Sequence, residues 1–511
     1  MTPERAFAAV DLGADSGRVV LGRVDGDSVS LEVVHRFANR PVRLPDGLHW
    51  NVLSLFADTL EGLARAGAKA PLAGIGVDAW GVDYALLDDA DHVLGLPFHY
   101  RDSRTRGMTD RVYERVAREE LYAVTGTQTM PINTIFQLMA ERDRPAAMAA
   151  KRLGLVPDLF GLWLTGELAN EVTAASTTGL LDARAGGWAR DLIARLGFPE
   201  APFAGEPVSP GTLLGPLLHL HAHVAGAATE VPVWTVAAHD TASAFVAAPL
   251  RGPGEAVLSS GTWSLLGLEV PAPFLSPDAA ALNLTNERGL DGTTRLLRNV
   301  MGLWLLQECR RCWQLAGAPC DYDDLHALAA SARPDVALFD PDDNALLIPG
   351  DMPAAIASLC RAGGQPPPTS RGEIVRSILL SLACKYRLVL EGLQLVTRST
   401  VDALRVVGGG VRNELLCQMT ADLTGLPVFA GPEEATALGN VLVQARAAGD
   451  LGGSLADLRE VAAASVKTAS YEPADERRSA ETYARFLAVT GLATRQPKPA
   501  VVGSQRLRRP A

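Results

Sequence analysis

The feature that most constrains the fold of this chain is a strand–turn–strand unit that occurs twice, about half a chain apart. In the first unit, a turn of small residues separates the apolar runs Phe7–Asp11 and Arg18–Val24. In the second, a serine-rich turn separates Ala256–Leu258 from Trp263–Val270. Short apolar runs joined by small residues are typical of β-hairpins. Because the repetition of a whole unit indicates duplication, we predict two related domains that each open with one hairpin.

Strand patterns alternate with helical patterns between and after the hairpins. The runs Leu72–Val77 and Val233–Ala237 are short, apolar and followed by polar residues, as buried strands are. The segment Ile374–Leu393 keeps one apolar face with helical periodicity. This alternation predicts an α/β fold.

A stretch rich in Pro and Gly directly before the second hairpin, Ala248–Gly254, marks the expected boundary between the two halves. We therefore predict an N-terminal domain over residues 1–248 and a C-terminal domain over residues 249–472. The chain then becomes polar, and its end, Arg495–Ala511, is basic and contains proline. Residues 473–511 are expected to form a flexible tail.

Charge and hydropathy exclude several classes of protein. The 511 residues include 47 Lys and Arg against 58 Asp and Glu, a net charge of −11, so nucleic acid is not an expected partner. No apolar run approaches the roughly 18 residues of a membrane helix, and the N-terminus lacks a signal-peptide pattern. The six cysteines show no disulfide framework, and helix packing is expected for Cys309 and Cys312. We expect a cytoplasmic protein with small-molecule partners, its oligomeric state left open.

The first turn carries residues that can bind phosphate. Small residues let backbone N–H groups approach phosphate oxygens, and a hydroxyl and a cation stand beside them. Asp11, at the end of the strand, can hold hydrated Mg²⁺ opposite the phosphates. An ordinary tight hairpin also uses glycine and aspartate, so this turn alone is ambiguous. The candidate phosphate contacts are Ala14, Asp15, Ser16, Gly17 and Arg18.

Two further elements can complete a nucleotide site. The second hairpin turn ends in Thr262, and two facing turns from duplicated domains would clamp a phosphate chain. The segment Val406–Gly410 ends in three glycines, on which a base or ribose can lie where a helix begins. A plain strand-to-helix turn would use the same glycines.

A polar triplet, His239-Asp240-Thr241, follows the strand that ends at Ala237. A carboxylate at a strand end can take the proton of a substrate hydroxyl, which makes Asp240 a candidate base for phosphoryl transfer. An aspartate that caps a helix starting at Thr241 is the alternative.

A tryptophan flanked by carboxylates follows another strand, in the segment Asp78–Asp83. The indole of Trp80 can cover the C–H face of a polyol while the two acids accept hydrogen bonds from its hydroxyls, which indicates a sugar site. A tryptophan packed in a turn is the simpler alternative.

Taken in order, these elements resemble the FGGY family of carbohydrate kinases. The resembling stretches are Val10–Ala14 with Gly17-Arg18, Gly76–Asp83, Tyr100–Thr105, Ala238–Ser243, Ser259–Ser264, Asn299–Gln307 and Val407–Gly410. The resemblance implies two actin-like (ribonuclease-H-like) ATPase domains with the active site in the cleft between them. It also implies that ATP, with Mg²⁺, phosphorylates L-rhamnulose at O1.

The resemblance also implies roles for particular residues. Asp240 would be the proton acceptor, and Asp11 would hold the metal through water. The implied sugar contacts are Gly81, His239, Asp240, Thr241 and Asn299. The implied ATP contacts are Ala14, Asp15, Ser16, Gly17, Arg18, Thr262, Gln307 and Gly409. Asp15 departs from the family, in which serine or threonine is common there, and its charge is expected to weaken phosphate binding.

Other functions stay open at the level of the sequence. The same base and clamp would serve a kinase for another ketose, such as L-fuculose or xylulose. The fold alone would also permit a non-catalytic actin-like ATPase that controls a protein partner, or a sugar-binding regulator without turnover. Sugar-stimulated ATP turnover separates these functions.

Overall fold

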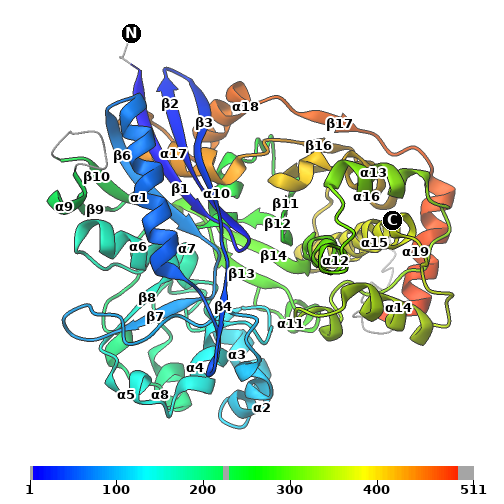
Figure 1. Cartoon of the computed structure of the whole chain (residues 1–511), viewed down its shortest axis with the longest axis horizontal. Coiled ribbons are helices and arrows are strands. Elements are labelled where there is room, and N and C mark those ends of the chain that lie inside the picture. Colours follow the sequence, from blue (N-terminus) through cyan, green and yellow to red (C-terminus); the bar gives the residue numbers. More distant parts are fainter. Residues whose placement is uncertain (1–3, 223–229, 493–511) are drawn as a thin grey trace, which may run out of the picture.

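The computed structural model describes residues 4–222 and 230–492 and has two lobes, each built on one large β-sheet (Figure 1). The sheet of the first lobe has the strand order β3-β2-β1-β6-β10-β9. Strands β1, β2 and β3 pair antiparallel, whereas β1, β6 and β10 run parallel. The strands of this sheet are β1 (Arg5–Leu12), β2 (Ser16–Asp25), β3 (Ser28–Ala38), β6 (Leu72–Ala79), β9 (Leu213–Pro216) and β10 (Pro232–His239).

The sheet of the second lobe repeats this arrangement, with the order β13-β14-β12-β11-β15-β16-β17. Its hairpin β11–β12 corresponds to β1–β2, and β11, β15 and β16 run parallel as β1, β6 and β10 do. The predicted duplication, the two hairpins and the α/β fold class are confirmed. The strands are β11 (Glu255–Ser260), β12 (Trp263–Val270), β13 (Thr285–Arg288), β14 (Thr294–Met301), β15 (Ala403–Val407), β16 (Val428–Ala430) and β17 (Ala469–Tyr471).

Parallel pairing brings the carboxyl ends of three strands to one edge of the first sheet. In this register Asp11 on β1 lies beside Asp78 on β6, and β10 ends with His239 beside Ala79. Ligands of α/β sheets bind outside the carboxyl ends of the strands. The polar residues that follow buried strands in the sequence therefore gather at one place.

Two helices cross between the lobes, α10 (Asp240–Ala247) and α17 (Ala435–Ala447) (Figure 1). Helix α17 belongs to the C-terminal half of the chain, yet it packs against β1, β6 and β10 of the first sheet. Gly439 of α17 lies where the helices touch, because a Cβ there would be 1.9 Å from the carbonyl oxygen of Ser243 on α10. The predicted boundary segment, 248–254, connects the two lobes along the chain. In space, however, the lobes pack together through the contact between α10 and α17.

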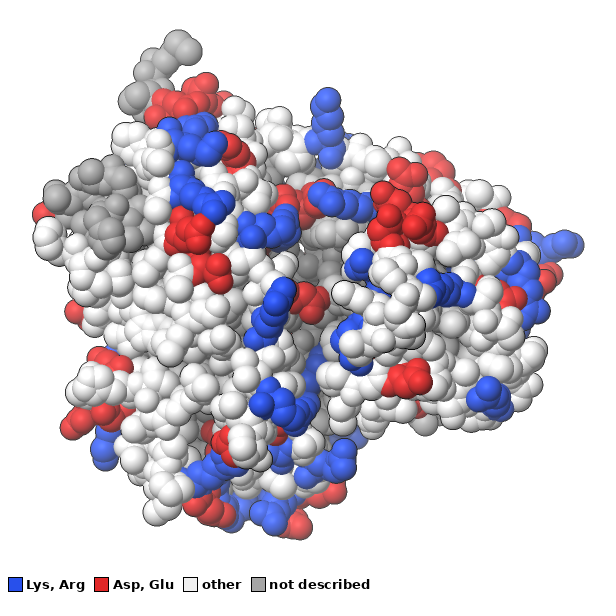
Figure 2. Space-filling model, in the orientation of Figure 1, with Lys and Arg blue, Asp and Glu red and all other residues white. Residues whose placement is uncertain are grey.

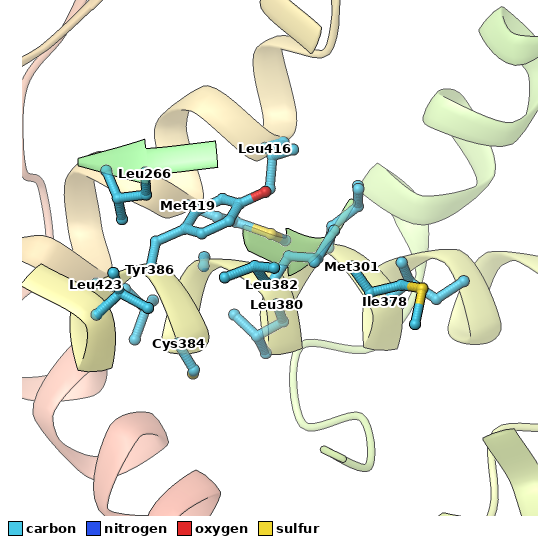
Figure 3. Close-up of a cluster of buried hydrophobic side chains, with 14 of the residues drawn as sticks. Leu266, Met301, Ile378, Leu380, Leu382, Cys384, Tyr386, Leu416, Met419 and Leu423 are labelled. Atoms are coloured by element: carbon cyan, nitrogen blue, oxygen red, sulfur yellow. The ribbon is translucent and has the colours of Figure 1, made fainter. Parts of the chain in front are cut away.

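The core of the second lobe forms around one long helix, α15 (Arg371–Thr397), which contains the predicted apolar face. Figure 3 shows Tyr386 of this helix among the side chains of Leu266, Leu416 and Met419. The Tyr386 hydroxyl and the Ser264 hydroxyl are 2.7 Å apart, so the buried phenol has a partner. This bond ties hairpin β11–β12 to α15.

The prediction of a tail over residues 473–511 is wrong for its first part. Helix α19 (Glu476–Thr490) packs on the second lobe, with Tyr483 and Phe486 buried. These two residues lie on one face of an otherwise polar helix, which explains why composition alone indicates a tail. The basic end, Arg495–Ala511, lies outside the described residues.

The remaining elements cover the sheets and connect their strands. Within the described ranges, no helix is both long and apolar enough to cross a membrane. Cys309 is buried in α12, in line with its expected packing role. Two short strand pairs are β4 (Val42–Leu44) with β5 (Gly47–His49) and β7 (Tyr84–Leu87) with β8 (Arg152–Leu155). The helices are α1 (Val52–Lys69), α2 (Met108–Tyr113), α3 (Arg118–Thr125), α4 (Thr134–Glu141), α5 (Pro145–Ala149), α6 (Val156–Thr165), α7 (Val172–Ala175), α8 (Arg190–Leu196), α9 (His219–Ala222), α11 (Pro277–Ala281), α12 (Trp304–Leu315), α13 (Tyr322–Ser331), α14 (Met352–Ala362), α16 (Glu414–Thr424) and α18 (Leu455–Ser465).

Candidate active site

A cavity of about 830 Å³ lies between the two lobes, and both hairpin turns contribute to its wall. Figure 2 shows the molecule hollowed between its two halves, with charged side chains of both signs at the rim. All but one of the predicted site residues line this cavity, although they come from distant parts of the chain. They are Asp11, Ala14, Asp15, Ser16, Arg18, Gly81, His239, Asp240, Thr241, Thr262, Asn299, Gln307 and Gly409.

Gly17 is the predicted site residue that does not line the cavity. It is buried on β2, where a Cβ would lie 2.2 Å from Cε2 of Phe37. The neighbouring strand β3 packs the Phe37 ring against this position, so glycine is required here by packing. The prediction of Gly17 as an ATP contact has no support in this geometry.

Asp11 and Asp240 line the cavity, whereas Asp78 is fully buried beside Asp11 and does not line it. The interpretation of Asp78 as an acceptor for sugar hydroxyls is therefore wrong. Burial raises the pKa of Asp78 well above its ordinary value, and the neighbouring charges of Asp11 and Asp240 raise it further. Asn440 of α17 donates to Asp78 Oδ2 at 2.6 Å, and Asp78 Oδ1 is buried without a partner. Of the three acids, Asp11 and Asp240 line the cavity, and each offers carboxylate oxygens of the kind that a hard divalent cation takes.

Arg18, the predicted cation of the phosphate turn, already has carboxylate partners. Its Nε lies 2.8 Å from Asp11 Oδ2 and 2.9 Å from Glu434 Oε2. The two acids raise the pKa of Arg18 despite its burial, so the guanidinium stays charged. Because Arg18 pairs with two acids, it orients Asp11 and Glu434, and its charge is only partly available to a phosphate ligand.

The interpretation of Asp83 as an acceptor for sugar hydroxyls is wrong. Its Oδ2 accepts hydrogen bonds from the indole N–H groups of Trp50 at 2.5 Å and Trp80 at 3.0 Å, and its Oδ1 accepts one from Gln137 at 2.8 Å. Burial raises the pKa of this carboxyl to about 6. Asp83 therefore fixes the turn that presents Trp80 and Gly81 to the cavity and does not itself reach a ligand.

Asp240 is the first residue of α10 and follows the end of β10 directly. Its Oδ1 accepts hydrogen bonds from the backbone N–H of Thr241 at 2.5 Å and from the Thr241 hydroxyl at 3.0 Å. Since α10 begins at Asp240 itself and His239 is its N-cap residue, the alternative in which Asp240 caps a helix starting at Thr241 is wrong. The exclusion of water raises the pKa of Asp240, and the neighbouring His239 lowers it.

A buried charged pair behind His239 is a part of the site that the sequence analysis missed. Oε2 of Glu287 lies 3.2 Å from both His239 Nδ1 and an Arg295 guanidinium nitrogen, and His239 Nε2 lies 3.4 Å from Asp240 Oδ1. Burial would raise the pKa of Glu287, but Arg295 and His239 outweigh it and the pKa is lowered. Glu287 and Arg295 face each other on adjacent strands, so opposite charges at paired strand positions were the available signal.

Asn299 is held from the opposite lobe by Gln128, another residue that the sequence analysis missed. Gln128 Oε1 accepts from the backbone N–H of Asn299 at 2.8 Å and from its side-chain amide at 3.1 Å. Gln128 Nε2 donates to the Asn299 carbonyl at 3.0 Å. These bonds orient Asn299 across the boundary between the lobes.

The two hairpin turns touch each other across the cavity. The Thr262 hydroxyl donates to Asp15 Oδ2 at 2.8 Å, and Gln307 Nε2 lies 3.5 Å from the same hydroxyl. The glycine run Gly408–Gly410 packs against the end of β11. A Cβ on Gly410 would lie 2.0 Å from Ser260 Oγ. The side chains of Asp15, Thr262 and Gln307 thus meet at the place where a phosphate chain is expected.

The duplicated sheets and the cavity between them define a two-lobed, actin-like ATPase fold. The chain belongs to the FGGY family of carbohydrate kinases, because residues 6–247 match the N-terminal domain of this family and residues 256–448 match its C-terminal domain. It is accordingly a carbohydrate kinase, and kinases of this family use ATP.

Relatives match almost the whole chain. A protein named Rhamnulokinase from Bacteroides thetaiotaomicron is 40% identical over 472 residues, covering 92% of this chain and 96% of the relative. One of the same name from Pectobacterium carotovorum subsp. carotovorum is 41% identical over 507 residues, covering 98% of each.

Solved structures support the fold. A xylulose kinase from Rhodospirillum rubrum has a TM-score of 0.74 at 20% identity, covering 96% of this chain and 99% of that one. A Plasmodium falciparum glycerol kinase with ADP has a TM-score of 0.72 at 16% identity, covering 97% and 98%.

Proposed function

We propose that this kinase transfers the γ-phosphoryl group of ATP to O1 of L-rhamnulose, with Asp240 as general base. The whole-length identity of about 40% to proteins named Rhamnulokinase supports the substrate. The observation that carries the chemistry is that Asp240 lines the same cavity as the polar residues assigned to the sugar and both hairpin turns.

In the proposed reaction the sugar lies against Gly81, His239, Thr241 and Asn299. Asp240 accepts the proton of the O1 hydroxyl while this oxygen forms a bond to the γ-phosphorus. The bond between that phosphorus and the oxygen bridging the β- and γ-phosphates breaks, and ADP leaves with the electron pair. His239 lies beside the carboxylate of Asp240, and the Arg295 guanidinium lies within hydrogen-bond distance of His239 Nδ1, at 3.2 Å.

The nucleotide is assigned to the opposite wall. Backbone N–H groups of Ala14, Asp15 and Ser16 and the hydroxyl of Thr262 face the phosphates, as small-residue turns do in phosphate sites. Gln307 and Gly409 bound the space for the nucleoside. Enclosure between two lobes keeps water from the γ-phosphate and so limits ATP hydrolysis.

The chemistry of the lining residues fits Mg²⁺, since Asp11 and Asp240 offer carboxylate oxygens to the cavity. Asp11 would hold the ion through water. When bound, Mg²⁺ neutralises charge that develops on the phosphates.

A panel of ketoses tests the proposed substrate. ADP release with Mg·ATP is measured with L-rhamnulose, L-fuculose, D-xylulose, L-xylulose, glycerol or no sugar. We expect L-rhamnulose to give the highest kcat/KM. Preference for another ketose would reject L-rhamnulose as the substrate but leave the assignment of Asp240 as base intact. If no sugar stimulated ADP release, both the proposed substrate and the proposed base would be rejected.

Replacing Asp15 by asparagine is expected to lower the KM for ATP about fivefold, because a unit charge about 4 Å from a phosphate costs about 1 kcal/mol in water. Asparagine keeps an oxygen that accepts from Thr262, so kcat is expected to change little. Steady-state kinetics with ATP varied measure both values. The matched control is Asp323→Asn, at the rim of the same cavity, where we expect no change. An increased KM in Asp15→Asn would show that the carboxylate assists nucleotide binding.

The acid limb of the pH profile is expected to follow Asp240. The base must be deprotonated, and the exclusion of water raises the pKa of Asp240 above the 3.8 of an ordinary aspartate. Activity should therefore be constant near neutral pH and fall about tenfold per unit once the pH drops below this raised pKa. The measurement is kcat at saturating ATP and sugar, with folding checked by circular dichroism at each pH. An acid limb with an apparent pKa of 3.8 or lower would contradict the assignment of the buried Asp240 as base.

A further inference from the structure

A second, small cavity lies beneath the strand that carries the catalytic residues. Its volume is about 10 Å³, and β10, β9, β6 and α6 contribute to its wall. Two acids line it, Asp158 of α6 and Glu171, and they are 5% and 0% exposed. Neither acid lines the large cavity between the lobes, and the reaction described above does not use them.

Three polar atoms of residues that line this small cavity have no protein partner. They are Asp158 Oδ2, Glu171 Oε1 and the indole nitrogen of Trp234. The other carboxylate oxygens are fully engaged: Asp158 Oδ1 accepts from the backbone N–H of Glu171 at 3.1 Å. A buried polar atom without a partner costs about 1–3 kcal/mol, so three around one cavity require an occupant.

The chemistry of these atoms identifies the occupant. An indole N–H can only donate, and a carboxyl oxygen that carries no hydrogen can only accept. A water molecule accepts one hydrogen bond from the indole and donates one to each acid, which satisfies all three atoms, and about 10–15 Å³ is the volume that one water needs. A cation would instead face the positive hydrogen of the indole.

We propose that this cavity holds one internal water bound by Asp158, Glu171 and Trp234, and that Glu171 is a positioning residue for the base Asp240. The second half of the proposal rests on the proposed function.

The link to Asp240 runs through the other oxygen of Glu171. Glu171 Oε2 accepts from the backbone N–H of Ala238 at 3.1 Å and from the Thr173 hydroxyl at 2.5 Å. The oxygen of that hydroxyl accepts from the backbone N–H of His239 at 3.1 Å. Glu171 thus holds the backbone N–H groups of the two residues before Asp240, that of Ala238 directly and that of His239 through Thr173.

The same carboxyl also organises the sugar side of the cavity. Glu171 Oε2 accepts from the backbone N–H groups of Thr173 and Ala174 and so caps helix α7. Just beyond this helix, the Thr177 hydroxyl accepts from the backbone N–H of Val82, next to Gly81. In the proposal, the water binds Glu171 Oε1, while Glu171 Oε2 helps to position both Asp240 and the turn that contains Gly81.

A high-resolution crystal structure of the full chain tests the water directly. We expect one density peak within about 2.5–3.2 Å of the three unpartnered atoms. The variant Trp234→Phe keeps an aromatic ring but removes the donor, and is expected to lose or displace the peak. An empty cavity, or a peak with the five or six oxygen neighbours of a cation, would overturn the assignment. This measurement is independent of the substrate.

Kinetics test the positioning role. Glu171→Ala is expected to lower kcat about 100-fold, the effect of a shift of about 1 Å in a catalytic group, while the KM for ATP stays unchanged. Glu171→Gln is expected to restore kcat to within about threefold, because its amide oxygen still accepts from the same donors. If the alanine variant does not fold, Glu171→Asp withdraws the carboxyl by one methylene and gives the same test. An unchanged kcat in the folded variant, or equal losses in kcat and ATP affinity, would overturn the role. If the wild-type enzyme phosphorylates another sugar, that sugar is used and only the proposed substrate fails.

Discussion

Replacing Asp240 by asparagine is expected to lower kcat about 1,000-fold, within the range of about 10²–10⁴ for the loss of a general base. Asparagine has the same shape, and its oxygen still accepts from the N–H and hydroxyl of Thr241. It cannot take the proton of the sugar hydroxyl. Discontinuous product assays at saturating ATP and sugar measure the loss in kcat.

The stability of this variant separates lost chemistry from lost structure. Asp240 is repelled by Asp11 and buried from water, both of which raise its pKa. Removing the charge is therefore expected to leave the melting temperature unchanged or to raise it. Asp323→Asn is the control for kcat, since Asp323 lines the same cavity at its exposed rim. If Asp240→Asn keeps more than about a tenth of the wild-type kcat, Asp240 is not the base.

Replacing Gly439 by alanine is expected to destabilise the protein by about 3 kcal/mol or more, the upper range for overpacked cores. The added Cβ would lie 1.9 Å from the Ser243 carbonyl oxygen and 2.6 Å from its carbonyl carbon. These are backbone atoms of α10, so relief requires the helices to separate. Since α10 begins with Asp240, we also expect kcat to fall. Thermal and urea unfolding measure the destabilisation.

The matched control is Gly392→Ala in α15. A Cβ there would approach only the side-chain ends of Leu282, at 3.3 and 3.5 Å. Alanine favours helix over glycine by about 1 kcal/mol, so this variant is expected to be as stable as the wild type or more stable. Equal stability of Gly439→Ala and Gly392→Ala would contradict the close crossing of α10 and α17.

The parts of the fold that local patterns encode were predictable. Both hairpins are apolar runs around small residues, and Asp240 follows a buried strand, so periodicity and position were sufficient signals. The resemblance to the family added the contacts on the second lobe, such as Asn299 and Gln307. Parallel pairing explains why Asp11 and His239 meet at one edge of the first sheet. Asn299 lies on the antiparallel strand β14 and Gln307 in α12, so their place in the cavity depends on how the two lobes pack.

The errors concern residues whose role depends on distant neighbours. The carboxyl of Asp83 is engaged by the indole of Trp50, which lies in the connection between β5 and α1, and Gly17 is glycine because of Phe37 on the next strand. The opposite charges of Glu287 and Arg295 are present in the sequence, but only the strand register shows that the two side chains face each other. Single-sequence patterns carry local preference, and burial of this kind is decided by tertiary packing.

The most direct test of the account is the identity of the product. The protein is incubated with ATP, Mg²⁺ and L-rhamnulose, and the phosphate ester is analysed by phosphorus–proton correlation NMR. Phosphorylation at O1 predicts that the new phosphorus couples to the two protons of C1. Coupling to a single proton would place the phosphate on a secondary hydroxyl, and the absence of a new ester would contradict the proposed function.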